Sequence, residues 1–334
     1  MVFKKMLGAL GVGGPSVDTV LAQPGAQPGG PLAGQVNLVG GSTDVEIEHI
    51  TLSLVTRVEV EGGSGDFGAT GEFHRTTVSG PLRLVAGQHL SLPFQLVLPW
   101  ETPATAVYGR PLPGMVMGVR TEVAIARAVD KGDLDPVQVH PLPIQQRILD
   151  AFAQLGFSIK GADLEYGRIA GVPQSLPFYQ EIEYFPSAQY AHAVNEVELT
   201  FVTNPHAVEV VLEFDKRGGM FGGGHDSYGR YTVSHADADA TDWAQVVDGW
   251  VRQALEHRRS MPGFAVASAS DHGHPGYVQP GYGHAGHPGY HGHYRQHHGS
   301  GMGGVAAGVA GGLAAGYVAG EVMDEVFDDE GGDE

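Results

Sequence analysis

Two pairs of glutamates have a spacing that hydrolases use. Glu181 and Glu183, and likewise Glu196 and Glu198, stand two residues apart in segments that alternate apolar and polar residues. Successive side chains of a strand point to opposite faces, so the members of each pair would share a face, where they could act as acid and base. The same pattern is typical of the solvated face of an antiparallel sheet, and we favour this interpretation.

Other features of the sequence also argue against an enzyme. It contains no nucleophile elbow, phosphate-binding loop or H-E-x-x-H motif, and no strand precedes the glycines of residues 8–14, as a dinucleotide site would require. It has no cysteine, which excludes a disulfide, a thiolate zinc site and a cysteine nucleophile. We therefore predict a protein that is not an enzyme, with no catalytic residues and no cofactor.

Eight of the 17 histidines fall between residues 272 and 298. Paired imidazoles on an extended chain chelate zinc, nickel or copper weakly, but fixed ligands at defined spacing are absent. The segment could instead become cationic on acidification, because the unperturbed histidine pKa is about 6.5, and so change its contacts with the body of the protein. A spacer without chemical consequence is the third interpretation. The weak metal candidates are His272, His274, His291, His293, His297 and His298.

A glycine repeat follows the histidines, with one glycine at every fourth residue. On a helix these glycines would form a bare stripe against which a second backbone could pack, as in associating membrane helices. Self-association, docking on a membrane or membrane protein, insertion and a disordered tail all stay open, because a segment so rich in glycine inserts weakly. The candidate interaction residues are Gly304, Gly308, Gly312, Gly316 and Gly320.

The charge balance restricts the partners. The 334 residues include 19 Lys and Arg against 38 Asp and Glu, a formal net charge of −19. A surface this acidic repels phosphate backbones, so nucleic acid is excluded as a general partner. Residues 1–14 lack a cleavage pattern for export, which predicts a cytoplasmic protein, with peripheral contact at the inner membrane surface as the alternative.

The elements that would position these residues are mainly strands. Val45–Val60 alternates apolar and polar residues, and glycine-rich turns separate it from other short segments of period two, which is typical of a β-sandwich. A polar stretch over residues 130–136 predicts the boundary between two domains. The strands expected before it are residues 17–21, 34–39, 45–60, 72–78, 89–98 and 116–128; those expected after it are 157–159, 179–184, 194–202 and 208–215.

The predicted organisation has five parts. Residues 1–14 form a short amphipathic helix, residues 15–131 an N-terminal sandwich, and residues 136–258 a C-terminal sandwich. Helices near 144–155 and 243–255 follow from apolar stripes, such as the one that contains Trp243, Val247 and Trp250. Residues 259–301 form a disordered Gly/His/Pro/Tyr-rich linker, and residues 302–334 a glycine-stripe helix candidate with an acidic tail.

Five segments, in this order along the chain, resemble the SpoOM-like sporulation-control proteins, a family within the wider arrestin-like group. They are GGPLAGQV at 29–36, the long strand at 45–60, LSLPFQLVLP at 90–99, ILDAFAQLGF at 148–157 and PFYQEIEY at 177–184. The resemblance spans roughly residues 1 to 258. It implies an all-β fold of two arrestin-like antiparallel β-sandwich domains, with a few short helices and a disordered His/Gly-rich C-terminal tail.

The resemblance also implies a function, although it carries no active site onto this chain. It implies a regulatory adaptor or scaffold in the control of sporulation or of related development and growth, acting on protein partners of developmental or cytoskeletal regulation. The alternative, from the glycine repeat, is a membrane-associated structural protein that self-assembles.

Overall fold

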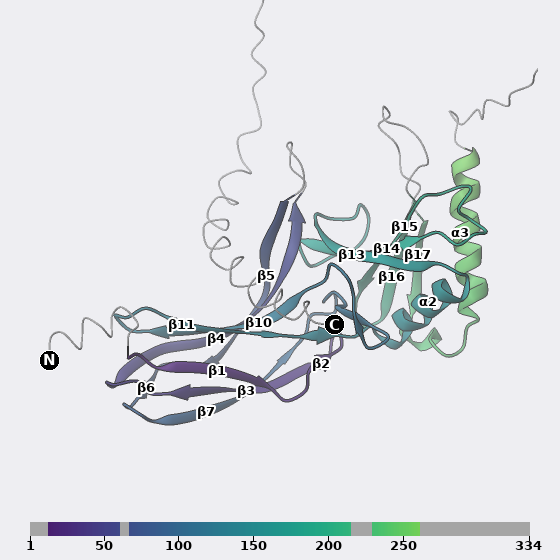
Figure 1. Ribbon diagram of the computed structural model, residues 1–334. Coiled ribbons are helices and arrows are strands. Elements are labelled where there is room, and N and C mark those ends of the chain that lie inside the picture. Colours follow the sequence, from purple (N-terminus) through teal and green to yellow (C-terminus); the bar gives the residue numbers. More distant parts are fainter. Residues whose placement is uncertain (1–12, 61–66, 215–228, 261–334) are drawn as a thin grey trace, which may run out of the picture.

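The computed structural model describes residues 13–60, 67–214 and 229–260, which form an elongated molecule (Figure 1). We call residues 13–141 the first half and residues 142–260 the second half. Residues 1–12 of the N-terminal helix expected over residues 1–14 lie outside the described residues, as do the histidine-rich segment and the glycine repeat.

Two sheets face each other in the first half. The smaller sheet is antiparallel, with the order β1-β3-β7. Its strands are β1 (Ser16–Leu21), β3 (Pro31–Val39) and β7 (His89–Val97). Side chains of period two from both sheets, such as Val36, Ile50 and Val119, are fully buried between the sheets. The first half is therefore a sheet-on-sheet structure, as its alternating pattern predicts.

The larger sheet runs through both halves in the order β11-β10-β4-β13-β14-β15-β16-β17, and two further strands, β5 and β6, pair with β4. Its first-half strands are β4 (Val45–Val60), β5 (Phe67–Ser79), β6 (Leu82–Leu84), β10 (Met117–Ile125) and β11 (Lys131–Pro136). Its second-half strands are β13 (Ser158–Tyr166), β14 (Phe178–Phe185), β15 (Val197–Thr203), β16 (Ala207–Phe214) and β17 (Gly229–Ser234). Two small pairings join β2 (Gly25–Ala26) to β12 (Gln138–Val139) and β8 (Ala106–Val107) to β9 (Arg110–Pro111).

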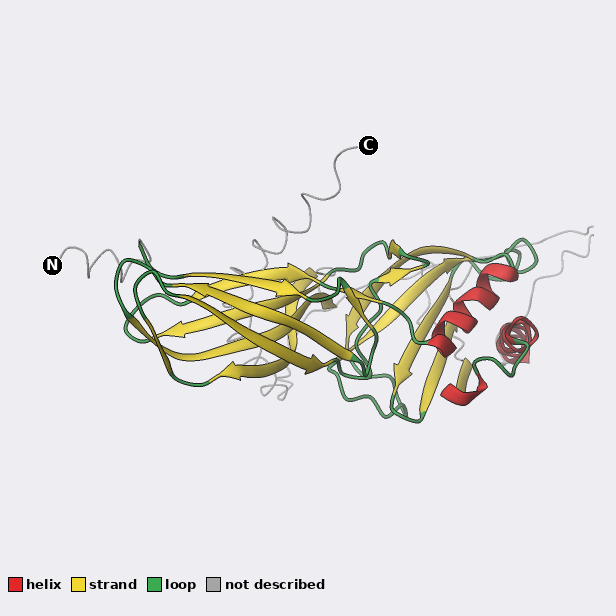
Figure 2. Cartoon of the chain, turned by 90° about the horizontal axis from the view of Figure 1, so that it is seen from below, coloured by secondary structure: helices red, strands yellow, loops and turns green. Residues whose placement is uncertain are grey.

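Helices cover the sheet in the second half. Figure 2 shows α2 (Pro143–Gln154) and α3 (Trp243–Ser260) together at this end of the molecule, near the short helix η1 (His235–Asp237). Phe152 of α2 and Val247 of α3 are fully buried in one cluster with Leu199 and Leu212 of the sheet. The face of the sheet that points toward the helices is therefore the apolar one.

Local sequence explains why α2 begins and ends where it does. Pro143 occupies the first turn, where a missing N–H has no cost, and the Gln145 side chain accepts a hydrogen bond from the backbone N–H of Leu142 at 2.8 Å. Gly156, just beyond the helix, has a φ of 85°, the left-handed conformation that favours glycine at a helix end. The helices expected near 144–155 and 243–255 are thus confirmed, with α3 continuing to Ser260.

The mostly-β class is confirmed, but two details differ from the sequence analysis. The stretch 130–136, expected as a boundary, contains strand β11, paired with β10; because β11 is an edge strand, it tolerates the glycine at 132 and the proline at 136. Among the described residues, the strands after residue 157 all belong to one sheet, and α2 and α3 lie where a second sheet of a C-terminal sandwich was expected. The division into two domains stays a prediction.

Within the described part of the chain, none of the helices combines the length and the apolar character that crossing a membrane requires. The alternative of a membrane-associated protein depends on the glycine repeat and stays a prediction.

Candidate interaction surface

The sheet of the second half carries carboxylates on the side that faces away from the helices. In β14, Ile182 and Tyr184 point into the core, so Glu181 and Glu183 point to the opposite face. Neighbouring strands contribute carboxylates to the same face. We call this set the acidic face: Glu59, Asp163, Glu165, Glu181, Glu183, Glu196, Glu198 and Glu213.

Strand register places like charges directly opposite one another. Glu198 of β15 is the cross-strand partner of Glu183 on one side and of Glu213 on the other. Asp163 of β13 is likewise the partner of Glu181. Directly opposed like charges destabilise a sheet, by up to about 1 kcal/mol for a pair. The register of the strands therefore places mutually repelling carboxylates next to one another on the acidic face.

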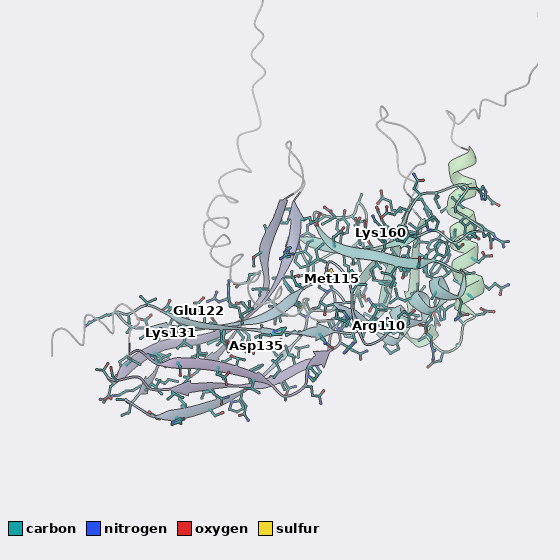
Figure 3. All side chains as sticks on the ribbon, in the orientation of Figure 1. Arg110, Met115, Glu122, Lys131, Asp135 and Lys160 are labelled. Atoms are coloured by element: carbon teal, nitrogen blue, oxygen red, sulfur yellow. The ribbon has the colours of Figure 1, made fainter. Side chains whose placement is uncertain are left out.

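Lys160 forms ion pairs with two carboxylates of this face. The pairing of β13 with β14 is irregular between Ile159 and Gly161, a bulge that leaves Lys160 outside the regular register. Its ammonium donates to Glu183 at 3.0 Å and to Glu196 at 2.7 Å, and these contacts raise the pKa of Lys160 above its ordinary value. Figure 3 labels Lys160 on the sheet of the second half. One lysine therefore neutralises part of one end of the acidic face.

Burial and the charges of neighbouring carboxylates raise the pKa of two carboxyl groups on this face. Burial, followed by the charge of Glu198 and other carboxylates, raises the pKa of Glu181 to about 9. Burial, followed by the charges of Glu183, Glu59 and Glu165, raises the pKa of Asp163 to about 7, although Lys160 acts in the opposite sense. The ionised forms of both groups are therefore disfavoured, and a nearby positive charge would restore them.

Two trios of carboxylates on the acidic face converge closely. Glu59, Asp163 and Glu165 form one, and a second consists of Glu181 with its neighbours on β15 and β16; the contributing oxygens of each trio lie within 4.8 Å of one another. Asp163 Oδ1 is buried and has no hydrogen-bond partner. Such groups of oxygen atoms attract cations, whether ammonium, guanidinium, imidazolium or metal ions.

The loop between β13 and β14, residues 167–177, borders the acidic face. Arg230 of the edge strand β17 donates to the carbonyl of Gly171 at 2.5 Å and to Glu209 at 3.1 Å. The carboxylate of Glu101, from the first half, accepts from the backbone N–H groups of Ser175 and Leu176 at 2.8 and 2.9 Å. Hydrogen bonds therefore hold the loop near its middle, at Gly171, and near its end, at Ser175 and Leu176.

The outer face of the same sheet in the first half is charged differently. Arg75 of β5 donates to Glu122 at 2.9 Å and to the Thr51 hydroxyl at 3.0 Å, and Arg120 pairs with Glu72. We call these four charged residues the paired face. Two arginines and two glutamates leave it with no net formal charge.

The structure brings together the two glutamate pairs that the sequence analysis singled out. Glu181, Glu183, Glu196 and Glu198 lie on one surface, as their spacing predicts, and that surface is the outer face of a sheet. Sequence reasoning missed the contributions of β4, β13 and β16. Asp163 and Glu165 show the same two-residue spacing, but only strand register shows that they join the others.

Comparison with known proteins places the chain in a family. A family model described as SpoOM protein matches residues 3–218. The chain belongs to this family. Its predicted resemblance to SpoOM-like sporulation-control proteins is thereby confirmed, and the matched residues include β13 to β16, which carry most of the acidic face.

Two relatives agree with this assignment. The sporulation-control protein spo0M of Bacillus subtilis (strain 168) is 31% identical over 217 residues, which cover 64% of this chain and 81% of the relative. The crystal structure of Spo0M, sporulation control protein, from Bacillus subtilis superposes with a TM-score of 0.64 at 26% identity, covering 73% of this chain and 100% of that one. Membership of the SpoOM family indicates a regulatory role in sporulation.

Proposed function

We propose that the chain is a cytoplasmic regulatory adaptor without enzymatic activity, and that its acidic face binds a cationic segment of a protein partner in sporulation control. The observation that carries this proposal is the row formed by Glu183, Glu198 and Glu213, which register holds directly opposite one another across three strands.

The energetic argument begins with the repulsion within the face. A group whose pKa is raised by neighbouring carboxylates gains from any cation placed beside it, because the cation favours the ionised form. Burial is the largest cause of the raised pKa of Glu181, about 9, and of Asp163, about 7, and neighbouring carboxylates add to it. A basic partner would therefore bind both through direct attraction and through relief of the repulsion.

The shape of the surface favours an extended partner. The carboxylates lie on successive strands, which are about 4.8 Å apart, so a row of three spans about 10 Å. Phe185, which is 53% exposed, follows two residues after Glu183 on the same side of β14 and offers an apolar contact at one end of the row. A segment that combines Lys or Arg with an apolar or aromatic residue would fit both features.

The test is proximity labelling in living cells with the full chain. The triple variant Glu183→Gln, Glu198→Gln, Glu213→Gln removes the charge of the row while keeping the side-chain shape. A matched control, Glu46→Gln, Glu48→Gln, Glu256→Gln, removes the same charge from residues outside the acidic face. We expect the labelled partners of the wild-type chain to be lost with the triple variant and kept with the control.

A second measurement identifies the nature of the contact. For a partner recovered in this way, the affinity should fall steeply as salt rises from 50 to about 500 mM, since ions screen charges at the protein surface. Recovery of the same partners by the triple variant, or an affinity that salt leaves unchanged, would refute the acidic face as the binding surface.

A further inference from the structure

The edges of the two sheets in the first half meet at β1 and β11. These strands lie side by side, although they belong to different sheets, and side chains close the gap between them. The buried hydroxyls of Thr19 in β1 and Thr121 in β10 share a hydrogen bond of 2.6 Å, and Asp133 of β11 accepts from the backbone N–H of Thr19 at 2.5 Å. We call Asp18, Thr19, Thr121, Asp133 and Asp135 the seam.

The backbone N–H of Thr19 lies on the open edge of β1. Just beyond this strand, Ala22 donates a hydrogen bond to the carbonyl of Ala33, the residue opposite it in the chain of β3. In an antiparallel pair such bonds involve every second residue, so the Thr19 N–H points away from β3 and toward β11. The carboxylate of Asp133 therefore supplies the acceptor that a neighbouring strand would otherwise provide.

Asp135, which Figure 3 labels, follows two residues after Asp133 on the same face of β11. Register places Asp135 opposite Val119 and Asp133 opposite Thr121, and both of these β10 residues are fully buried, so the two aspartates point toward the interior between the sheets. Asp135 Oδ2 is buried and, among the described residues, has no hydrogen-bond partner. This position favours the neutral carboxyl form, because burying a charge costs more than burying a neutral polar group.

We propose that the seam is a pH-sensitive closure, which is closed when Asp135 is protonated and opens when it ionises, because the carboxylates of Asp18, Asp133 and Asp135 then repel one another. Opening frees the outward edge of β1, and a free strand edge is a surface on which another strand can pair. The inference concerns the first half and is independent of the acidic face and of the proposed partner.

The charged groups near Asp135 belong to two strands. They are Asp18 on β1, and Lys131 and Asp133 on β11. The side chains that β1 and β10 direct toward the interior are uncharged: Val17, Thr19, Leu21, Val119, Thr121 and Val123.

The direction of the pH dependence follows from these surroundings. Burial, followed by the charges of Asp133 and Asp18, raises the pKa of Asp135 to about 7. In the open seam the carboxyl group is solvated, and its pKa returns toward the ordinary value of 3.8. The closed seam is therefore fully favoured below about pH 4, loses stability as pH rises from 4 to 7, and changes little above pH 7.

Hydrogen exchange of the Thr19 amide in the full chain, followed by NMR, measures this opening directly. After correction for the intrinsic exchange rate, we expect its protection factor to fall about tenfold between pH 5 and pH 8. A shift of one unit in a pKa corresponds to a tenfold change, and the partial exposure of the seam reduces the effect of the larger shift. The amide of Val20, which bonds β3, should keep its protection, which separates opening of the seam from unfolding of the whole half.

Three variants test the cause. Asp135→Asn keeps the shape of the side chain without its charge, and should hold the Thr19 amide at its pH 5 protection at both pH values. Asp133→Ala removes the acceptor and should give low protection at both. The control Glu48→Gln, at an exposed position of β4, should keep the tenfold response. A tenfold response that persists in Asp135→Asn overturns the proposal.

The wild-type chain provides a check that needs no variant. NMR titration of the side-chain carboxyl carbon of Asp135 should give a midpoint near pH 7, and the protection of the Thr19 amide should stop falling at about the same pH. A midpoint near pH 4, or a Thr19 protection factor that does not depend on pH, also overturns the proposal.

Discussion

The two outer faces of the large sheet carry charge in opposite ways. Over β4, β5 and β10, the paired face joins each arginine to a glutamate, as between Arg75 and Glu122 at 2.9 Å. Over β13 to β16, Lys160 contacts two of the carboxylates, Glu183 and Glu196, and register places several carboxylates opposite each other. Both faces belong to one sheet, so strand geometry is the same and the difference lies in the side chains.

The paired face balances its charges with its own side chains. Exposed ion pairs contribute little to stability, typically 0 to about 1 kcal/mol, but the pairs on the paired face cancel its charge and cover Thr51, which is 4% exposed. On the acidic face, Asp163 and Glu181 keep raised pKa values. The paired face balances its own charges, whereas the proposed function requires the acidic face to gain from an added cation.

The largest effect should follow from making the paired face resemble the acidic one. Arg75→Glu would place a third carboxylate beside Glu72 and Glu122 and remove the hydrogen bond to Thr51. We expect the free energy of unfolding to fall by about 3 kcal/mol, from repulsion and the loss of a donor to a buried hydroxyl. Urea denaturation measures this change, and Arg75→Lys is the matched control. A loss below about 0.5 kcal/mol would show that pairing on this face has no role in stability.

A converse substitution on the acidic face should stabilise the protein. The carboxyl group of Glu181 has an ordinary pKa of 4.5 and a folded-state pKa of about 9, so ionisation costs stability as pH rises between these values. Glu181→Gln removes this cost. At pH 8 we expect a gain of about 2 kcal/mol, after allowance for solvent screening, and no gain at pH 4. Thermal unfolding across this range measures it, with Glu48→Gln as control. An equal change at both pH values would contradict the electrostatic cause.

Two aspartates with raised pKa values, Asp135 in the first half and Asp163 in the second half, allow a further test of the comparison. Burial and the charge of Asp133 raise the pKa of Asp135 in β11 to about 7, and Asp163 on the acidic face reaches the same value. Both are partly exposed, so Asp135→Asn and Asp163→Asn should each stabilise by only about 1 kcal/mol at pH 8 and not at pH 4. Denaturation midpoints at both pH values are the measurement. Added salt should reduce both gains, because the charges of neighbouring carboxylates contribute to both raised pKa values. Gains that salt leaves unchanged would count against a contribution from these charges.

The smallest effect concerns the lysine on the acidic face. Lys160→Gln removes the donor to Glu183 and Glu196 and the positive charge between them. Because the side chain is 38% exposed, we expect a loss of less than about 1 kcal/mol at pH 8. The pKa of Glu196, already above its ordinary value, should rise further, which NMR titration of the side-chain carboxyl measures. Lys160→Arg should restore both values, and a stability unchanged in Lys160→Gln would mean that the ion pairs are not formed in solution.

Several elements could be predicted from the sequence because their cause is local. The alternation of apolar and polar residues over Val45–Val60, although not strict, predicts both ends of β4. The Pro143 and Gly156 signals predict both ends of α2 to within one residue. The same alternation correctly predicted that Glu181 and Glu183 share a face, as do Glu196 and Glu198. These features depend on neighbours two to four residues apart, which the sequence displays directly.

Other features required the tertiary structure because they depend on residues far apart in the chain. Strand order placed Asp163, Glu181, Glu198 and Glu213 together, although they span fifty residues of sequence. The polar stretch that contains Asp133 and Asp135 is a strand only because β10 pairs with it. The apolar face of β14 to β16 is covered by helices, and alternation alone records that a face is buried but not what buries it. The sequence therefore determined which residues share a face, and long-range pairing decided that one of these faces concentrates negative charge.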